Sequence, residues 1–139
     1  GLGIGDLWPG LGMTVADAFL AVHRSYAQAV TPVLPRLHAL AHITGGGIPG
    51  NLVRVLPKGC KAVVDPGTWD WPPLFRLLQE AGKVTTDEMR DVFNLGVGLI
   101  AVLPEDGVAA ARAAARADGI ETWVIGRIEA GSHGVRFTG

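Results

Sequence analysis

The most distinctive chemical feature of the sequence is a run of three glycines, Gly45, Gly46 and Gly47, preceded by Thr44 and His42. Glycines leave their backbone N–H groups unshielded and can adopt positive φ. A helix beginning just after them would add further free N–H groups, so the segment predicts a cradle for a phosphate or carboxylate. The threonine adds a hydroxyl, and the histidine adds a donor or base. A tight turn between a strand and a helix explains the same residues, and their spacing matches neither a Walker A loop nor a dinucleotide fingerprint.

A second candidate is the loop that begins at Asp65. This residue directly follows an expected strand, which would place its carboxylate at the edge of a sheet. The rings of Trp69 and Trp71 in the same loop are flat enough to stack on a planar ligand. A loop held by prolines, with one tryptophan filling the core, accounts for the same pattern, and the residues by themselves favour that structural interpretation.

A third candidate lies around Asn94, where Gly96 and Gly98 stand at the entry to an expected strand. Two glycines at such a position indicate that a ligand or another chain segment approaches closely. They are equally compatible with a bulge.

Other polar side chains give weaker signals. Arg24 has the N–H groups to bind a phosphate bidentately, although a surface arginine without such a role is the more common case. His23, His38 and His133 are scattered, with no pair at metal-ligand spacing on an expected element, so no metal site is predicted. No Ser-His-Asp or Cys-His set can be assembled either, which leaves the catalytic residues unknown.

Helices and strands alternate along the chain, and this positions the three candidate segments. A first helix is expected from Thr14 to a break at Pro32. The other expected helices span 33–40, 74–81, 85–92 and 104–118, and the expected strands span 60–64, 95–103, 121–128 and 135–138. Such alternation predicts an α/β (α+β) layered sandwich, with a mixed sheet covered by helices. The strand at 95–103, the helix after it and the strand at 121–128 predict one right-handed β-α-β crossover.

Composition narrows the class of protein. The 139 residues fit one domain, and 48% hydrophobic with 18% charged residues indicates a globular chain. A net charge of -1 without runs of like charge argues against binding to nucleic acid or a membrane surface. The single cysteine, Cys60, excludes an internal disulfide and fits a reducing, cytoplasmic location. Residues 1–13 are expected to be a lead-in, possibly truncated, and residues 14–139 the domain.

The candidate segments together resemble one family. The residues from Ala41 to Pro57, from Asp65 to Gly82 and from Glu88 to Gly98 are similar, in order and spacing, to phosphoribosylformylglycinamidine cyclo-ligase. The likeness runs from about residue 14 to residue 135 and concerns the C-terminal domain of that enzyme. Selenophosphate synthetase, thiamine-phosphate kinase, hydrogenase maturation factors and formylglycinamidine synthetase share the fold, but these segments look like the cyclo-ligase.

The resemblance implies a partly ferredoxin-like α/β sandwich. It implies part of an ATP-dependent enzyme that converts formylglycinamidine ribonucleotide to aminoimidazole ribonucleotide in purine biosynthesis. The family enzyme is a homodimer, and its N-terminal domain, absent here, carries most of the ATP and Mg²⁺ site. No cofactor is therefore expected in this chain alone, which should be inactive by itself. The phosphorylated ribonucleotide substrate is expected in the cleft between the domains.

The resemblance also assigns candidate binding residues. The substrate- and phosphate-binding residues expected on this basis are His42, Thr44, Gly45, Gly46, Gly47, Asn51, Asp65 and Asn94. The three glycines and the threonine would hold a phosphate, and the other four would orient the ligand or the loop. Arg24 is a candidate for a further phosphate contact.

The first expected helix departs from the family. Where the family reads Leu-Leu-Glu-Pro-Thr-Arg-Ile-Tyr, this chain matches at Arg24 and Tyr26 but not at the Glu, the Pro or the Thr, which His23 replaces. The departure leaves open a non-catalytic binding or partner-interaction module derived from the domain, or a relative with another phosphorylated substrate. A domain that lacks its partner should expose an apolar patch, which predicts self-association as a dimer.

Overall fold

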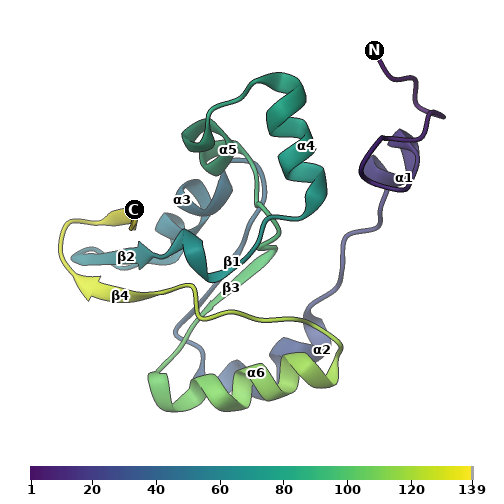
Figure 1. Ribbon diagram of the computed structural model, residues 1–139. Coiled ribbons are helices and arrows are strands. Elements are labelled where there is room, and N and C mark those ends of the chain that lie inside the picture. Colours follow the sequence, from purple (N-terminus) through teal and green to yellow (C-terminus); the bar gives the residue numbers. More distant parts are fainter. Residues whose placement is uncertain (139) are drawn as a thin grey trace.

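The computed structural model describes residues 1–138 and combines helices with two β-sheets (Figure 1). The α-helices are α1 (Val15–Phe19), α2 (Ala27–Val30), α3 (Gly47–Leu52), α4 (Pro73–Gly82), α5 (Thr86–Val92) and α6 (Val108–Ala117). The strands are β1 (Ala39–His42), β2 (Cys60–Val64), β3 (Leu99–Val102), β4 (Gly126–Ala130) and β5 (Gly134–Phe137). Short 3₁₀ turns occupy Thr31–Arg36, Val53–Val55, Pro66–Thr68 and Glu105–Gly107. This mixture confirms the α/β class predicted from the sequence.

The strands form one antiparallel pair and one mixed sheet. In the pair, β1 lies against β3 with Ala39 opposite Val102 and His42 opposite Leu99. In the second sheet β2 is central, antiparallel to β4 and parallel to β5. The predicted strand at 60–64 is confirmed at both ends, because a run of apolar residues in a central strand is buried on both faces.

The predicted β-α-β crossover is wrong. β3 and β4 flank α6 in the sequence, but β3 pairs with β1 and β4 pairs with β2, in different sheets. The extended residues before β4 carry Trp123 and Ile125, which pack against the core. The alternation of apolar residues therefore reflects which side chains are buried. Which strand each segment pairs with depends on residues far away in the sequence.

The single first helix predicted from Thr14 to Pro32 is also wrong. Two short helices, α1 and α2, stand there with non-helical residues between them. Phe19 and Val22 stand at the spacing of an apolar helix face, but both side chains are exposed. Helical spacing without tertiary packing does not sustain a long helix, because most helical stability in proteins comes from a buried face.

Two further boundaries differ from the prediction. The expected helix at 33–40 is a 3₁₀ turn that contains Pro35, which lacks an N–H donor, and β1 follows it. The expected strand at 95–103 shrinks to β3, because Leu95 and Gly96 have φ values of 52° and 95° and form a turn. Positive φ at a leucine is rare, so the residue type at this position did not predict the turn.

The core lies where both sheets meet α3. Its most buried members include Ile43, Ile48, Val64, Trp69 and Val97. They come from the residues around β1, α3, β2 and the approach to β3, so the glycine run at 45–47 sits directly on the core. Burial of such side chains contributes about 1.5–3 kcal/mol each, which makes this the best-anchored part of the domain.

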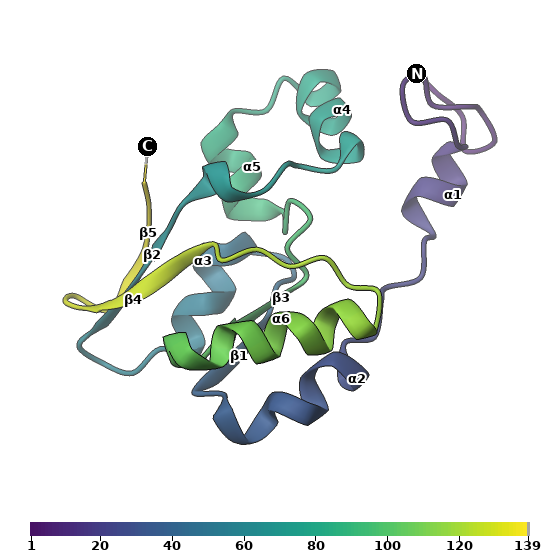
Figure 2. The same cartoon turned by 60° about the horizontal axis from the view of Figure 1, so that its bottom comes forward.

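Helices cover the sheets on opposite sides, as Figures 1 and 2 show. α2 lies along α6 on one side, and α3 packs against α5 on the other. The N-terminal residues with α1 stand at the end of the molecule, where Gly10 approaches the side chain of Leu77 on α4. Within residues 1–138, no helix combines the length and the apolar character that a membrane crossing requires.

Candidate functional site

The loop between β1 and α3 is held by one buried side chain, that of Asn51, which is 6% exposed. Its amide nitrogen donates to the carbonyl oxygen of Gly47 at 2.7 Å and to those of Thr44 and Gly45 at 3.3 Å each. Its Oδ1 accepts a hydrogen bond from the Thr44 hydroxyl at 3.3 Å. A buried amide that satisfies its partners in this way fixes the loop conformation, because any other path would leave polar groups unpaired.

The three glycines of the loop meet different steric demands. Gly46 and Gly47 have φ values of 95° and 57°, which side-chain-bearing residues rarely adopt. A Cβ on Gly47 would overlap the carbonyl oxygen of Arg90 and lie 3.1 Å from that of Phe93. A Cβ on Gly45 would meet nothing within 4 Å. Gly47 therefore allows α3 to approach the end of α5, whereas Gly45 borders open space.

Free N–H groups remain on the outer side of this loop. The N–H of Gly47 donates to the carbonyl of Thr44 at 3.1 Å. Within residues 1–138, the N–H groups of Gly45 and Gly46 donate to no protein acceptor. Thr44 and Gly45 are exposed and Gly46 is half-buried, so these two backbone donors are available to a small anion. The threonine hydroxyl is already engaged as a donor to Oδ1 of Asn51. Because α3 has only six residues, any anion here would depend on the loop and not on a helix dipole.

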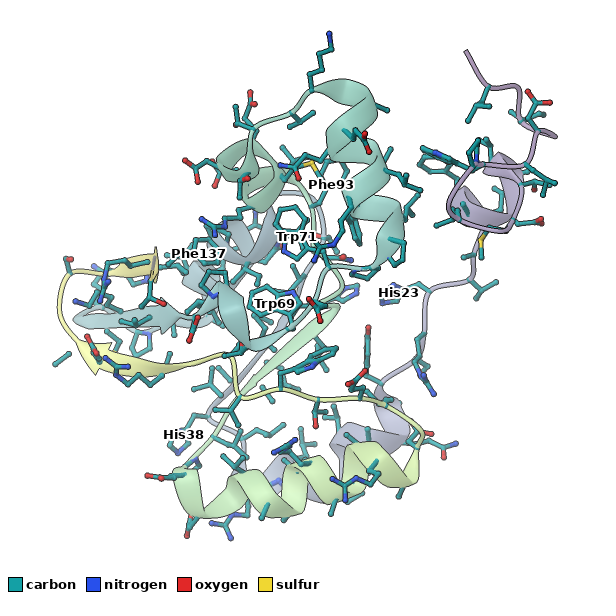
Figure 3. The ribbon with its side chains drawn as sticks, in the orientation of Figure 1. His23, His38, Trp69, Trp71, Phe93 and Phe137 are labelled. Atoms are coloured by element: carbon teal, nitrogen blue, oxygen red, sulfur yellow. The ribbon has the colours of Figure 1, made fainter. Side chains whose placement is uncertain are left out.

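His42, at the end of β1, meets a residue that the sequence did not connect with it. Its Nε2 lies 3.0 Å from Nε2 of His23, with the ring centres 4.9 Å apart at 65°. Tyr26 lies edge-on to His23 at 5.6 Å. Figure 3 shows His23 projecting from the N-terminal segment toward the body of the domain. The two histidines are 19 positions apart in the sequence. They meet because the chain between α1 and α2 is not helical and passes close to the end of β1.

Asp65 and Asn94 use their side chains within their own turns. Oδ1 of Asp65 accepts the N–H of Gly67 at 2.9 Å, and Oδ1 of Asn94 accepts the N–H of Gly96 at 3.0 Å. Such bonds are typical of Asp and Asn at turns. Among the described residues 1–138, neither side chain hydrogen-bonds to the loop that begins at Thr44.

Arg24 is also engaged elsewhere. Its guanidinium donates to the carbonyl oxygen of Asp118 at 2.8 Å, just beyond the last turn of α6. A cation at this place offsets the partial negative charge of the helix end. The structure therefore ties Arg24 to α6 and away from the glycine loop.

Trp69 is a core residue. It is 6% exposed, and its Nε1 donates to the carbonyl oxygen of Leu95 at 3.1 Å. Trp71 is half-buried against the same core, and Figure 3 shows both rings within the body of the domain. The structural interpretation of this loop is thus the better one for Trp69.

The glycines before β3 make room for chain segments. A Cβ on Gly96 would lie 2.6 Å from Cδ of Pro72, and one on Gly98 would overlap the hydroxyl of Tyr26. The carbonyl of Gly98 also accepts the N–H of Ile43 at 2.9 Å. The three motifs noted in the sequence therefore pack on one another.

The carboxyl groups with shifted pKa values and the largely apolar cavity under α2 and α6 lie away from the glycine loop. Two carboxyl groups have lowered pKa values, and both lie on other elements. A hydrogen bond from the Thr85 side chain lowers the pKa of Glu88, and one from Arg127 lowers the pKa of Glu129. Within residues 1–138, no three His, Cys, Asp or Glu side chains gather as an ion site. A cavity of about 430 Å³ under α2 and α6 is mostly apolar, with Val33 and Ile100 in its wall.

Comparison with known proteins places the fold and the family. Residues 3–138 match the family model "AIR synthase related protein, C-terminal domain". The chain is 48% identical over 125 residues to a phosphoribosylformylglycinamidine cyclo-ligase of Anaeromyxobacter dehalogenans, covering 88% of this chain and 36% of that protein. It is 49% identical over 107 residues to the cyclo-ligase of Citrifermentans bemidjiense, covering 76% and 31%.

A solved structure shares the fold. Thiamine-monophosphate kinase from Stenotrophomonas maltophilia aligns with a TM-score of 0.55 and 20% identity, over 77% of this chain and 33% of that chain. The chain spans about a third of the length of the curated relatives it matches. The family match over nearly the whole chain supports the resemblance noted in the three motifs. The chain therefore belongs to the AIR synthase related proteins, as a C-terminal domain of that family.

Proposed function

We propose that this chain is the C-terminal part of an ATP-dependent cyclo-ligase that converts formylglycinamidine ribonucleotide to aminoimidazole ribonucleotide in purine biosynthesis. Its identity of 48% with named cyclo-ligases over most of its length supports this assignment. Because it spans about a third of those relatives, we propose that it is inactive alone. The N-terminal domain would then hold most of the ATP and Mg²⁺ site.

In this proposal the loop from Thr44 to Gly47 binds a phosphate of the substrate. The observation that carries this role is the pair of free N–H groups at Gly45 and Gly46, in a loop fixed by buried Asn51. Donors that are already in place need no reorganisation when the anion arrives, so more of the binding energy remains available. The hydroxyl of Thr44 donates to Oδ1 of Asn51, so it would have to turn away from that amide to become a further donor to the anion.

Ring closure requires that a nitrogen and the formyl carbon of one substrate be held in reacting position. ATP supplies the phosphoryl group that activates the formyl oxygen. The contribution of this chain is to hold the phosphorylated end of the substrate, so that the reacting atoms stay in place.

The proposal includes a cytoplasmic homodimer. Exposed large apolar side chains gather in the first 22 residues, and Phe19, Leu20 and Val22 are 57%, 78% and 95% exposed. Apolar groups at this density favour contact with a protein surface. We assign that contact to the N-terminal domain of the same protein or to the second subunit.

The loop can be tested by Gly45→Val in this chain, assayed together with a separately produced N-terminal domain of the family. A side chain at Gly45 has free space, so the domain should fold while the N–H cradle becomes shielded. We expect KM for formylglycinamidine ribonucleotide to rise at least about tenfold, a loss of roughly 1.4 kcal/mol of binding, with kcat little changed. Gly46→Val is the poorer probe, because a φ of 95° would strain a valine and confuse folding with binding.

The matched control is Gly131→Val. Gly131 lies in the turn between β4 and β5, where a Cβ would meet only the flexible side chain of Lys61 at 3.5 Å. It should leave KM unchanged. Equal KM values for the Gly45→Val variant and this control would remove the phosphate role from the loop.

A further inference from the structure

The histidine pair joins His42, an expected substrate-binding residue, to His23, which the proposed function does not use. His23 and His42 approach through their Nε2 atoms at 3.0 Å, and both residues are exposed. If both rings lay in line along a direct hydrogen bond of that length, their centres would be about 5.3 Å apart. The observed separation is 4.9 Å, with the rings at 65°. The two rings therefore do not lie in line along the axis that joins the two nitrogens.

That arrangement matches two imidazoles on a single ion. With metal–nitrogen bonds of about 2.0–2.1 Å and an angle of about 94° at the metal, the nitrogens would be about 3.0 Å apart and the ring centres about 4.7 Å apart. At the tetrahedral angle of about 109° these separations would be roughly 3.3 Å and 5.2 Å. The observed nitrogen–nitrogen separation of 3.0 Å equals the value for the smaller angle, and the ring-centre separation of 4.9 Å lies between the values for the two angles.

We propose that His23 and His42 together bind one divalent transition-metal ion of the Cu²⁺, Ni²⁺ and Zn²⁺ class. Imidazole nitrogen is a preferred ligand for these ions, and an angle near 90° favours the square-planar or octahedral geometry of Cu²⁺ and Ni²⁺. Within residues 1–138 no third His, Cys, Asp or Glu joins the pair. The other coordination positions are therefore left to water, and binding is reversible.

The bound ion would fasten the N-terminal segment to the sheet. His23 lies in the non-helical stretch between α1 and α2, whereas His42 ends β1. Tyr26 packs edge-on against His23 and limits the movement of its ring. This inference does not rest on the proposed function, since the ion needs neither the N-terminal domain nor the substrate.

The test uses the full chain without a polyhistidine tag, titrated with Ni²⁺, Cu²⁺ or Zn²⁺ by isothermal calorimetry. We expect one saturable site per chain. His23→Thr, which removes one of the two ligands, should weaken it at least about tenfold. In the presence of Ni²⁺, paramagnetic broadening in histidine NMR spectra should affect His23 and His42 first. Amide hydrogen exchange across residues 20–26 should slow when the metal is added.

His38→Asn is the matched control, because His38 is an exposed histidine just before β1, at the other end of that strand from His42. It should bind the ion as the unmodified chain does. Two outcomes would overturn the inference. One is the absence of saturable binding, which would leave the pair as a simple hydrogen bond. The other is an affinity that His23→Thr leaves unchanged, which would place the ion elsewhere.

Discussion

Asn51 determines the geometry of the glycine loop at the level of single residues. Its amide reaches three carbonyl oxygens with two N–H groups, in a position that is 6% exposed. The sequence predicted Asn51 as a residue that orients the ligand or the loop. The contacts show the second of these roles, and the ligand role stays a prediction.

The change Asn51→Asp tests this dependence. It keeps the size of the side chain, but it removes both donors and sets a carboxylate against the carbonyl oxygens of Gly47 and its neighbours. We expect the free energy of unfolding to fall by about 2–4 kcal/mol, measured by urea denaturation. Asn94→Asp is the control, because Asn94 acts as an acceptor and a carboxylate can replace it. Equal losses in the two variants would mean that the amide donors do not hold the loop.

Residue types and spacing revealed only part of this site. The loop from Gly45 to Gly47 could be predicted because glycine is the residue that readily adopts positive φ, and Gly46 and Gly47 do adopt it. The pairing of His23 with His42 was not visible, since nothing local links residues 19 positions apart. The hydrogen bond from Arg24 to the carbonyl oxygen of Asp118 could not be predicted for the same reason, because the two residues are 94 positions apart.

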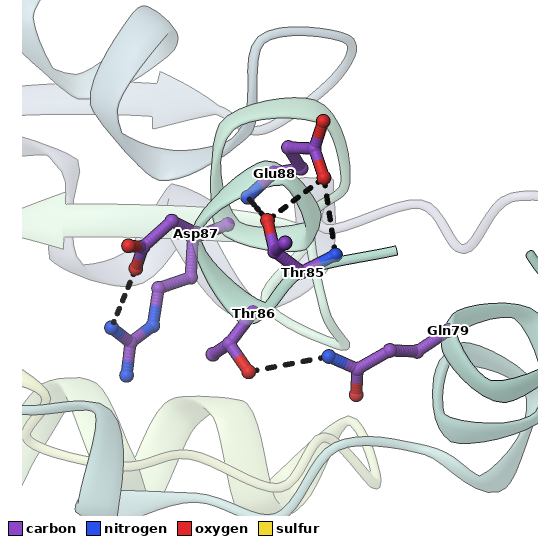
Figure 4. A network of polar contacts seen from close by, with 6 residues as sticks. Gln79, Thr85, Thr86, Asp87 and Glu88 are labelled. Carbon is purple, nitrogen blue, oxygen red and sulfur yellow. Dashed lines mark hydrogen bonds and ion pairs between the residues drawn. The ribbon is translucent and has the colours of Figure 1, made fainter. Parts of the chain in front are cut away.

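At the level of elements, α5 shows how local sequence can fix a boundary. Thr85 accepts the N–H of Glu88 at 3.3 Å, and Glu88 accepts the N–H of Thr85 at 3.1 Å, as Figure 4 shows. The helix predicted at 85–92 is confirmed, with this capping box at its start and its end at Val92. The start of this helix could be predicted from the sequence because the residues of the capping box lie within one helical turn of each other.

Thr85→Ala should lower the free energy of unfolding by about 1 kcal/mol near neutral pH, measured by thermal denaturation. The hydrogen bonds from Thr85 hold the pKa of Glu88 below its usual value of 4.5 in the folded state. A lowered folded pKa means that this contribution is present above the unfolded pKa and is lost as pH falls through the folded pKa. The difference in Tm between the variant and the unmodified chain should therefore shrink in acid.

Thr86→Ala serves as the control for that series. Thr86 is exposed, and its hydroxyl accepts a hydrogen bond from the side-chain amide of Gln79 at 3.2 Å, in the same network of Figure 4. Its effect should be small and independent of acid pH. A difference for Thr85→Ala that stays constant from neutral pH to well below pH 4.5 would contradict the coupling to Glu88.

Elements that depend on distant partners were predicted less well. The predicted strand Cys60–Val64 was confirmed because its own run of apolar residues already indicates burial on both faces. The long first helix failed because nothing packs against Phe19, Leu20 and Val22 within the described residues 1–138 strongly enough to bury them. The β-α-β unit failed because the choice between two sheets depends on β1 and β2, far from α6 in the sequence.

At the level of the whole molecule, a well-anchored core carries a site that faces outward. The loop from Thr44 to Gly47 sits on the core at Ile43 and Ile48, which are 1% and 2% exposed. The first 22 residues, in contrast, leave most of their large apolar side chains in solvent. Such a division fits a domain whose loop and N-terminal segment meet other surfaces in a longer protein. The match to about a third of the length of its curated relatives agrees with that view.

The most direct test of the central claim is ring closure by a mixture of this chain with a separately produced N-terminal domain of the family. The assay contains ATP, Mg²⁺ and formylglycinamidine ribonucleotide, and it follows aminoimidazole ribonucleotide and ADP together. We expect product from the mixture only, with neither part active alone. Co-sedimentation establishes in parallel that the two parts associate. Association without product, at concentrations where the complex has formed, would contradict the account and favour a non-catalytic module.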